Sequence, residues 1–226
     1  MNGTHVPVLV TEVVDAFEVS PGKRYIDATV GLGGHAAEIG ERGGIVLGID
    51  QDEEALKIAK TRVEAVLVHG NFKDIERIAK EKGFSNVDGV LFDLGVSSLQ
   101  LDTPQRGFSY RYADAPLDLR MDQSKGETAS ELVNRASEKE LYDIFSEFGE
   151  EQHSRSISEA LYRARPVRTV GDLVRVVGTS KSVLSRIFQA LRIAVNDELG
   201  SLKAGLEGAQ RLLKPGGKLV VISFHS

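Results

Sequence analysis

The sequence predicts an α/β fold in which a parallel sheet of β-α-β units is interrupted by an all-helical lobe. Short β-branched runs alternate with amphipathic stretches over residues 24–93. A long stretch without strand patterns follows, and a helix and a strand then resume the α/β pattern. A chain of 226 residues can bury a stable core as one large domain or as one domain with an insertion.

The sheet is expected to contain strands at 24–30, 44–50, 65–70, 87–93 and 218–224. Asp52 and Asn71 can each cap a helix between two of these strands, and Gly83 can end the second helix. The strand period is lost after Asp93, so residues 95–123 are predicted to form a long functional loop. Several short helices follow, and the inserted lobe is placed at residues 107–191.

A long helix precedes the last expected strand. Its apolar residues at 199, 202, 206, 209 and 213 predict an inward stripe, and Pro215-Gly216-Gly217 is expected to end it. A sheet that finishes with 218–224 would leave a hydrophobic edge, which proteins usually cover. We expect a C-terminal segment absent from this sequence, or a second copy of the chain in a homodimer, to cover that edge.

The charge is unevenly distributed. The chain carries a net charge of −5, but residues 153–192 contain eight basic and two acidic residues. This asymmetry is typical of an acidic catalytic body with a basic lobe that faces a polyanion, although solvated arginine faces would give the same pattern. No apolar run approaches the ~20 residues that cross a membrane, and no targeting signal is visible, so a cytoplasmic protein without membrane contact is expected.

The first expected strand leads into a glycine-rich turn, DATVGLGGHA, at 27–36. Asp50 follows Gly31 by 19 residues and ends the second strand, where a carboxylate can bind both hydroxyls of a ribose. Asp27 and Thr29 are polar at a place where a dinucleotide-binding strand is normally apolar. The ammonium and carboxylate groups of S-adenosylmethionine need such partners, so this cofactor is favoured over NAD and over a turn that binds nothing.

Several motifs together resemble the MraW-type (RsmH) ribosomal RNA cytosine-N4 methyltransferases. They are HVPVL (5–9), DATVGLGGH (27–35), GNF (70–72), FDLGVSS (92–98), RGFSY (106–110), PLDLRMD (116–122), FQALRIAVNDEL (188–199) and LKPGGKLVVISFHS (213–226). They follow one another along the whole chain. The resemblance implies methyl transfer to the exocyclic N4 of a cytosine in the decoding region of 16S rRNA, with the small ribosomal subunit as partner.

The resemblance also implies a Rossmann-like class I methyltransferase sheet with an inserted helical lobe. Residues 1–106 and 192–226 would form the S-adenosylmethionine-binding catalytic domain, and 107–191 the substrate-recognition domain. Family members continue past ISFHS, so the final strands are expected to be absent here. The cofactor contacts that it implies are Gly33, Gly34, His35, Asp50, Phe72, Asp93 and Gln100.

The chemistry of amine methylation singles out two further roles. Asp93 can orient the cytosine amine, whose lone pair is conjugated with the ring, or it can bind the cofactor alone. Asn196 can bind the base edge or cap the long helix. His35, exposed by its glycines, is expected to serve cofactor binding rather than act as a base, and His225 is incidental. The chain has no cysteine, so a cysteine nucleophile for carbon-5 methylation and thiolate metal sites are excluded, and no metal is expected.

The loop at 106–120 interleaves aromatic and guanidinium side chains, as base stacking combined with phosphate binding requires. The candidates for RNA contact are Arg106, Phe108, Arg111 and Arg120. The alternative is a loop pinned to the body, with Arg120 paired to Asp118 or Asp122.

Two other functions remain open at the level of sequence. A truncated chain could bind cofactor or RNA without turnover. An amino-methyltransferase could also act on another nucleic acid, although DLGVSS differs from the Asn/Asp-Pro-Pro-Tyr motif of DNA amino-methyltransferases.

Overall fold

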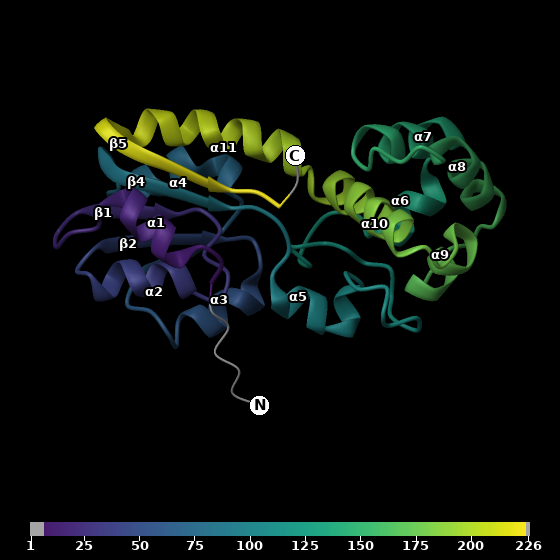
Figure 1. Cartoon of the computed structure of the whole chain (residues 1–226), viewed down its shortest axis with the longest axis horizontal. Coiled ribbons are helices and arrows are strands. Elements are labelled where there is room, and N and C mark those ends of the chain that lie inside the picture. Colours follow the sequence, from purple (N-terminus) through teal and green to yellow (C-terminus); the bar gives the residue numbers. More distant parts are fainter. Residues whose placement is uncertain (1–6, 225–226) are drawn as a thin grey trace. The chain divides into compact units, whose positions relative to one another are not determined.

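The computed structural model describes residues 7–224 of the chain, which fold into two compact units (Figure 1). Unit 1 comprises residues 1–95 and 200–226, and unit 2 comprises residues 96–199. Unit 2 begins before the expected residue 107 and ends after 191, because two short helical turns at its start and the end of its longest helix belong to it. Among the described residues, no helix combines the length and apolar character that a membrane span requires.

Unit 1 is built on a parallel sheet of five strands in the order β3-β2-β1-β4-β5. The strands are β1 (Arg24–Asp27), β2 (Ile45–Asp50), β3 (Val66–His69), β4 (Val87–Asp93) and β5 (Leu213–Ile222). All five strands expected from the sequence are therefore present. Since β1 lies between β2 and β4, the carboxyl ends of these three strands meet at one edge of the sheet.

The start of β5 differs from the prediction. Leu213 already pairs with Val87, and the register then shifts so that Lys218 pairs with Gly89. Pro215-Gly216-Gly217 therefore forms an irregularity inside the strand rather than a separator between helix and strand, with Gly216 at a φ of 80°. An edge strand tolerates a proline that cannot donate to the ladder.

Helices cover both faces of the sheet (Figure 1). One face packs against α1 (Val10–Phe17), α2 (Gly34–Glu41) and α3 (Glu53–Ala59). The other packs against α4 (Ile75–Glu81), which follows the short turn η1 (Phe72–Asp74), and against α11 (Glu198–Leu212). The expected cap of α3 by Asp52 is confirmed, because its side chain accepts hydrogen bonds from the N–H groups of Glu54 and Ala55.

The buried face of α11 is only partly the predicted one. Leu199, the first member of the predicted apolar stripe, is 55% exposed, whereas Ser201, Gly205, Gly208, Ala209 and Leu212 are buried. A Cβ atom at Gly205 would lie 2.9 Å from Cδ2 of Phe72, and one at Gly208 would lie 2.7 Å from Cγ2 of Ile75. The helix thus approaches the layer below through its small residues.

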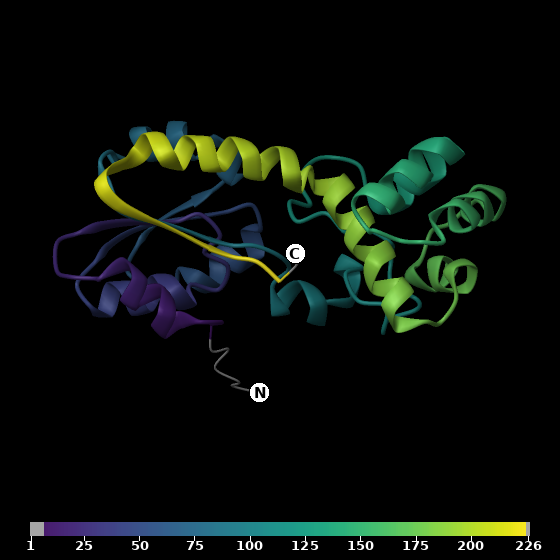
Figure 2. The same ribbon diagram turned by 45° about the horizontal axis from the view of Figure 1, so that its top comes forward.

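Unit 2 is helical around a core of its own. Its elements are α5 (Ser98–Asp102), η2 (Pro104–Arg106), α6 (Ala129–Arg135), α7 (Glu138–Glu147), α8 (Ser154–Arg163), α9 (Val170–Val177) and α10 (Lys181–Asn196). Figure 2 shows α7 and α8 side by side. The segment 95–123, predicted as one long loop, includes α5 and η2 and contributes buried side chains to this core.

Candidate functional site

Three aspartates stand at the last positions of adjacent strands in unit 1. Asp27 ends β1, Asp50 ends β2 and Asp93 ends β4. They are close enough that the charges of Asp50 and Asp93 both raise the pKa of Asp27. The carboxyl edge of the sheet therefore carries a concentrated negative charge, which favours the binding of a cation or of several hydrogen-bond donors.

Asp27 is the most buried of the three, with 1% of its surface exposed. Its Oδ1 accepts a hydrogen bond from the Thr29 N–H at 3.2 Å, and its Oδ2 has no hydrogen-bond partner among the described residues. Burial, opposed by the Thr29 bond and reinforced by the neighbouring carboxylates, raises the pKa of Asp27 to about 7. A cationic group at Oδ2 would stabilise its ionised form.

Asp50 holds the glycine-rich turn and the start of α3 together. Its Oδ2 accepts from the Gly31 N–H at 2.7 Å, and its Oδ1 accepts from the Asp52 N–H at 2.8 Å. Burial raises the pKa of Asp50 to about 6, although these two hydrogen bonds lower it. Each carboxylate oxygen can accept more than one hydrogen bond, so a partly exposed Asp50 can still accept from two hydroxyl groups.

Asp93 is tied to β1 through its backbone. Its N–H donates to Oγ1 of Thr29 at 2.7 Å, which joins the ends of β1 and β4. The two polar residues that the sequence singled out in the first strand, Asp27 and Thr29, thus both take part in this edge. The partly exposed Asp93 carboxyl group lies at the end of a strand fixed on both sides by neighbours.

The glycines at the start of α2 are required by packing and backbone conformation. Gly33 caps the helix at a φ of 88°, in the left-handed region that favours glycine. A Cβ atom there would lie 3.1 Å from Cγ1 of Val63, and one at Gly34 would lie 2.9 Å from Cγ of Pro7. Side chains at either position would therefore push against the protein itself.

The predicted exposure of His35 is wrong. The residue is 5% exposed, and its Nε2 forms a 2.9 Å hydrogen bond with the carbonyl of Val8. The glycines before it allow the helix to pack closely, which buries the ring instead of exposing it. This bond fixes the segment that leads into α1. The histidines at 5 and 225 lie outside the residues that the structure describes.

Phe72 is held in a fixed orientation at the other end of the edge. Its ring packs against that of Phe92 in an edge-on arrangement with 5.5 Å between centroids. The preceding Asn71 accepts from the Lys73 N–H at 2.9 Å and thereby caps η1, as its position in the sequence predicted. Gly205 of α11 lies close to this ring, since a Cβ atom there would be 2.9 Å from Cδ2 of Phe72.

Sequence reasoning missed a polar link beside Phe72. The Asn71 amide donates to Oε1 of Gln51 at 3.1 Å and to Oγ of Ser201 at 3.3 Å. Ser201 is 1% exposed and lies on α11, far from Asn71 in sequence, so only the folded chain reveals the contact. The link joins the ends of β2 and β3 to α11.

Gln100 belongs to unit 2. It is 5% exposed, and its Oε1 accepts from the Ser97 N–H at 3.1 Å while its own N–H donates to Oγ of Ser97. This reciprocal capping box begins α5. Its role in the fold is therefore that of a helix cap.

Asn196 is the last residue of α10 rather than the cap of the following helix, so the capping alternative is wrong. Its Oδ1 accepts from the Met121 N–H, and its Nδ2 donates to the carbonyls of Leu119 and Arg192, all at 2.8 Å. The side chain thus binds backbone groups on both sides of Arg120. Leu119 has a φ of 62°, a conformation that few non-glycine residues adopt.

Arg106 and Phe108 lie inside unit 2, which corrects their predicted contact with RNA. Arg106 is 2% exposed and donates to the carbonyls of Arg120 and Met121. Phe108 is 7% exposed and belongs to the hydrophobic core. The loop that carries them folds inward, so these two side chains support the loop instead of facing a ligand.

Arg120 and Arg111 have carboxylate partners. Arg120 donates to both oxygens of Asp118, at 2.7 and 3.0 Å, as the pinned-loop alternative required. Burial alone would raise the pKa of Asp118, but the hydrogen bonds from Arg120 outweigh it and lower the pKa. Arg111 pairs at 3.2 Å with Asp102, and both side chains are mostly exposed, so this pair contributes little and can open to a ligand.

Residues 2–226 match the sequence profile of the family described as the MraW methylase family. The chain belongs to the MraW methylase family. The match includes the glycine-rich turn, the three strand-end aspartates and the whole of unit 2.

Curated members of related sequence carry the name ribosomal RNA small subunit methyltransferase H. The protein from Symbiobacterium thermophilum is 47% identical over 98% of this chain and 76% of its own length. The protein from Deinococcus radiodurans is 47% identical over 99% of this chain and 75% of its own length. A crystal structure of an rRNA methylase from Streptococcus thermophilus is 20% identical over 41% of this chain and 58% of that one, with a TM-score of 0.34.

The part of this MraW methylase family member that the structure describes contains no candidate metal centre. Among residues 7–224, no cluster of three or more histidine, aspartate or glutamate side chains has an arrangement that could hold a metal ion. The edge of the sheet fits an organic ligand better, because it combines a buried carboxylate, a glycine-rich turn and a fixed aromatic ring.

Proposed function

We propose that the chain transfers a methyl group from S-adenosylmethionine to the exocyclic N4 of a cytosine in the decoding region of 16S rRNA. The proposal is supported by the buried Asp27 and the glycine-rich turn at the carboxyl edge of the sheet, in a chain whose family profile matches throughout. Membership of the family and the names of its relatives favour small-subunit rRNA as the substrate.

The residues present fit the proposed cofactor. Asp50, which already orders Gly31, would accept hydrogen bonds from the ribose hydroxyls. Phe72 would lie beside the adenine, Gly33 and Gly34 would allow close backbone approach, and Oδ2 of Asp27 would face the ammonium group. S-adenosylmethionine supplies an electrophilic methyl group when bound.

The task of the protein is then to orient the amine. The cytosine N4 lone pair is conjugated with the ring, so an acceptor that binds its hydrogens is needed to turn the lone pair toward the methyl group. We assign this role to the partly exposed Asp93 carboxylate, because Asp27 is buried and Asp50 already accepts hydrogen bonds from the N–H groups of Gly31 and Asp52. Asp93 would also accept the proton, or pass it to solvent, as the new bond forms.

The test is transfer of labelled methyl from S-adenosylmethionine to small ribosomal subunits, followed by mass spectrometry of the nucleosides. The expected product is N4-methylcytidine, with loss of transfer in Asp93→Asn but retained cofactor binding by calorimetry. Equal loss of cofactor binding in Asp93→Asn would assign Asp93 to the cofactor alone. Cofactor binding by the unaltered chain without any transfer would support the binding-only alternative, and a methylated base in another nucleic acid would overturn the substrate.

A further inference from the structure

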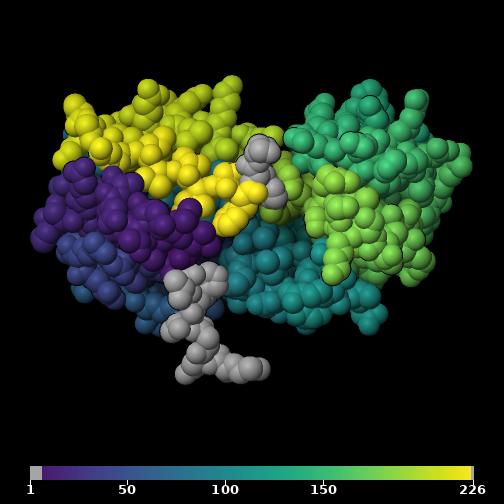
Figure 3. All heavy atoms as spheres, in the orientation of Figure 1, coloured from purple at the N-terminus to yellow at the C-terminus, as the bar shows by residue number. Residues whose placement is uncertain are grey.

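We infer that a surface between α8 and α9 of unit 2, made by Tyr162, Arg165 and Arg168, binds unpaired RNA. We call this surface the α8–α9 corner. The inference rests on the proposed function, because an rRNA methyltransferase needs an RNA-binding surface and the burial of Arg106 and Phe108 removes two candidates for it. In Figure 3 the green atoms, which include those of α8 and α9, form part of the surface of unit 2.

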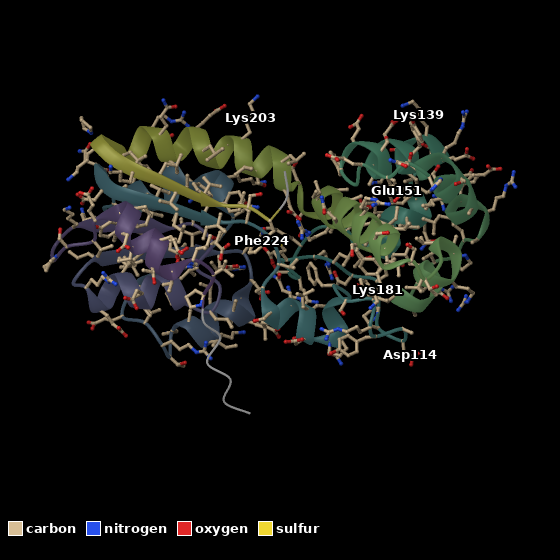
Figure 4. All side chains as sticks on the ribbon, viewed as in Figure 1. Asp114, Lys139, Glu151, Lys181, Lys203 and Phe224 are labelled. Carbon is tan, nitrogen blue, oxygen red and sulfur yellow. The ribbon has the colours of Figure 1, made fainter. Side chains whose placement is uncertain are left out.

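Most cations of unit 2 are neutralised by carboxylates of the same unit. The paired residues are Arg111, Arg120, Lys125, Arg135, Lys139, Arg163, Arg175, Arg186 and Arg192. Within residues 96–199, all of which the structure describes, the exposed cations without an ion pair are Arg155, Arg168 and Lys181, the last labelled in Figure 4. These unpaired charges all fall on α8, on α9's leading segment or at the start of α10. Of these three cations, Arg168 lies in the segment between α8 and α9.

The α8–α9 corner combines this charge with an exposed aromatic ring. Tyr162 is 46% exposed, so its ring is accessible to a ligand. The guanidinium carbon of Arg165 lies 4.5 Å from the Tyr162 ring centroid, and the same guanidinium donates to the Ala136 carbonyl. The second contact holds Arg165 in place, so the pair forms a fixed flat surface on which an unstacked base can stack.

The backbone of the corner is held from both sides. The Asn134 amide accepts from the Val167 N–H at 2.9 Å and donates to the Val167 carbonyl at 2.7 Å. The Arg168 N–H donates to Asp172 at 3.0 Å, but the Asp172 carboxylate forms its ion pair with Arg175. The Arg168 side chain therefore stays unpaired on an ordered backbone, and binding a phosphate there requires little additional ordering.

Single-stranded RNA fits these features better than a duplex or an acidic protein does. A duplex offers phosphates but hides its base faces, and the carboxylates of an acidic protein would bind the arginines without using the exposed Tyr162 ring. The Tyr162 ring with the Arg165 guanidinium can stack on a base, and the unpaired Arg168 can bind an adjacent phosphate.

The experiment measures binding of a fluorescein-labelled single-stranded RNA oligonucleotide by anisotropy, and methyl transfer to small subunits, in the full chain. Tyr162→Leu should weaken single-strand binding roughly tenfold and Tyr162→Phe should restore it, because stacking needs the ring and not the hydroxyl. Arg168→Gln should weaken binding and lower the slope of log Kd against log salt by about 0.7. Arg42→Gln, an exposed arginine at the end of α2 in unit 1, is the matched control.

Tyr162→Leu and Arg168→Gln should each raise KM for small subunits while leaving kcat and the cofactor Kd unchanged. Unchanged RNA affinity in Tyr162→Leu and in Arg168→Gln, with normal thermal unfolding, would overturn the inference. Equal binding of a duplex, insensitive to Tyr162→Leu, would also overturn it and point to charge alone or to another partner. If the unaltered chain transfers no methyl group but the two variants still lose RNA binding, the result would support RNA binding at the α8–α9 corner and refute the proposed activity.

Discussion

The buried carboxyl group of Asp27 lowers the stability of the folded protein when it is ionised, and the fold alone does not explain its presence. Its carboxyl group is 1% exposed, and one oxygen lacks a hydrogen-bond partner among the described residues. An ionised carboxylate in such a place is destabilising unless a cation joins it. We expect a bound ligand to offset this destabilisation, since the binding of an ammonium group would recover part of that free energy.

Replacing Asp27 by Asn should stabilise the ligand-free protein and weaken cofactor binding. Burial raises the pKa of Asp27 from 3.8 to about 7, so the folded protein holds this proton more tightly than the unfolded chain. The contribution of Asp27 to stability is therefore greatest below about pH 4 and falls as the pH rises toward 7. We expect Asp27→Asn to gain about 1 to 4 kcal/mol in unfolding free energy at pH 8 and nothing at pH 4.

Urea unfolding at the two pH values measures the gain, and calorimetry at pH 8 measures the cofactor Kd, which should rise at least tenfold. Unaltered affinity combined with higher stability would show that Asp27 is a purely structural liability.

Asn196→Ala should destabilise unit 2 through the backbone around Arg120. The substitution removes three hydrogen bonds at 2.8 Å and the restraint on Leu119 in its left-handed conformation. We expect a loss of about 2 to 4 kcal/mol in unfolding free energy. The control on the same helix is Gln189→Ala, which removes one 3.3 Å bond to the Phe148 carbonyl and should cost less than about 1.5 kcal/mol. Similar losses in both variants would contradict the assignment.

At the scale of residues, the sequence predicted the side chains that end the strands. It did not predict which side chains of the loop at 106–120 are buried. Asp50 was placed by its distance from Gly31, and their 2.7 Å hydrogen bond confirms that they meet. The burial of Arg106 depends on carbonyls 14 and 15 residues away, in a segment without periodicity. No local pattern distinguishes such an arginine from one that faces RNA.

At the scale of elements, the glycines of α11 determine how closely it packs. Alanine is normally preferred in a helix by about 1 kcal/mol. At Gly205, however, a Cβ atom would lie 2.9 Å from Phe72 and 3.1 Å from Phe92. The helix therefore gives up intrinsic propensity to approach the two aromatic rings.

Gly205→Ala should lower the unfolding free energy by about 1 to 3 kcal/mol, since overpacking outweighs propensity. It should also weaken cofactor binding, because Phe72 is the residue displaced. Gly40→Ala in α2, where nothing lies within 4 Å of the added atom, should instead be neutral or stabilising by up to about 1 kcal/mol. Thermal denaturation with and without cofactor separates the two effects, and a stabilised Gly205→Ala would refute the packing argument.

The predicted elements were most reliable where the pattern was periodic. The strands and the α3 cap were found because β-branched runs and Asp52 are local signals. The buried face of α11 was predicted only in part, because an apolar stripe indicates Ala209 and its neighbours but not the small residues Gly205 and Gly208, which the close packing favours. Four helices of unit 2 begin with capping boxes, headed by Ser97, Thr128, Ser137 and Thr169. These boxes are local signals that could have divided the lobe into its helices.

At the scale of the whole molecule, the edge strand β5 exposes apolar side chains. Leu219 is 43% exposed and Val221 is 44% exposed, and within the described residues β5 pairs on one side only. Such an edge can template pairing with another chain. We expect the 226-residue chain to self-associate in a concentration-dependent way.

Leu219→Lys should suppress this association in sedimentation velocity experiments, because a charge on an edge strand opposes edge-to-edge pairing. Leu199→Lys changes a side chain that is 55% exposed but lies on a helix, so it should have little effect. A chain that stays monomeric at high concentration, or that responds equally to both substitutions, would contradict the role of the edge.

The discontinuity of unit 1 also has a consequence for biosynthesis. The ribosome releases β1 to β4 first, then all of unit 2, and only afterwards α11 and β5. Unit 2 is continuous in sequence and can complete its core while β4, an interior strand of the finished sheet, still waits for its neighbour. Nascent chains should therefore pass through a stage in which unit 2 is folded while the sheet of unit 1 still lacks β5 and its cover by α11.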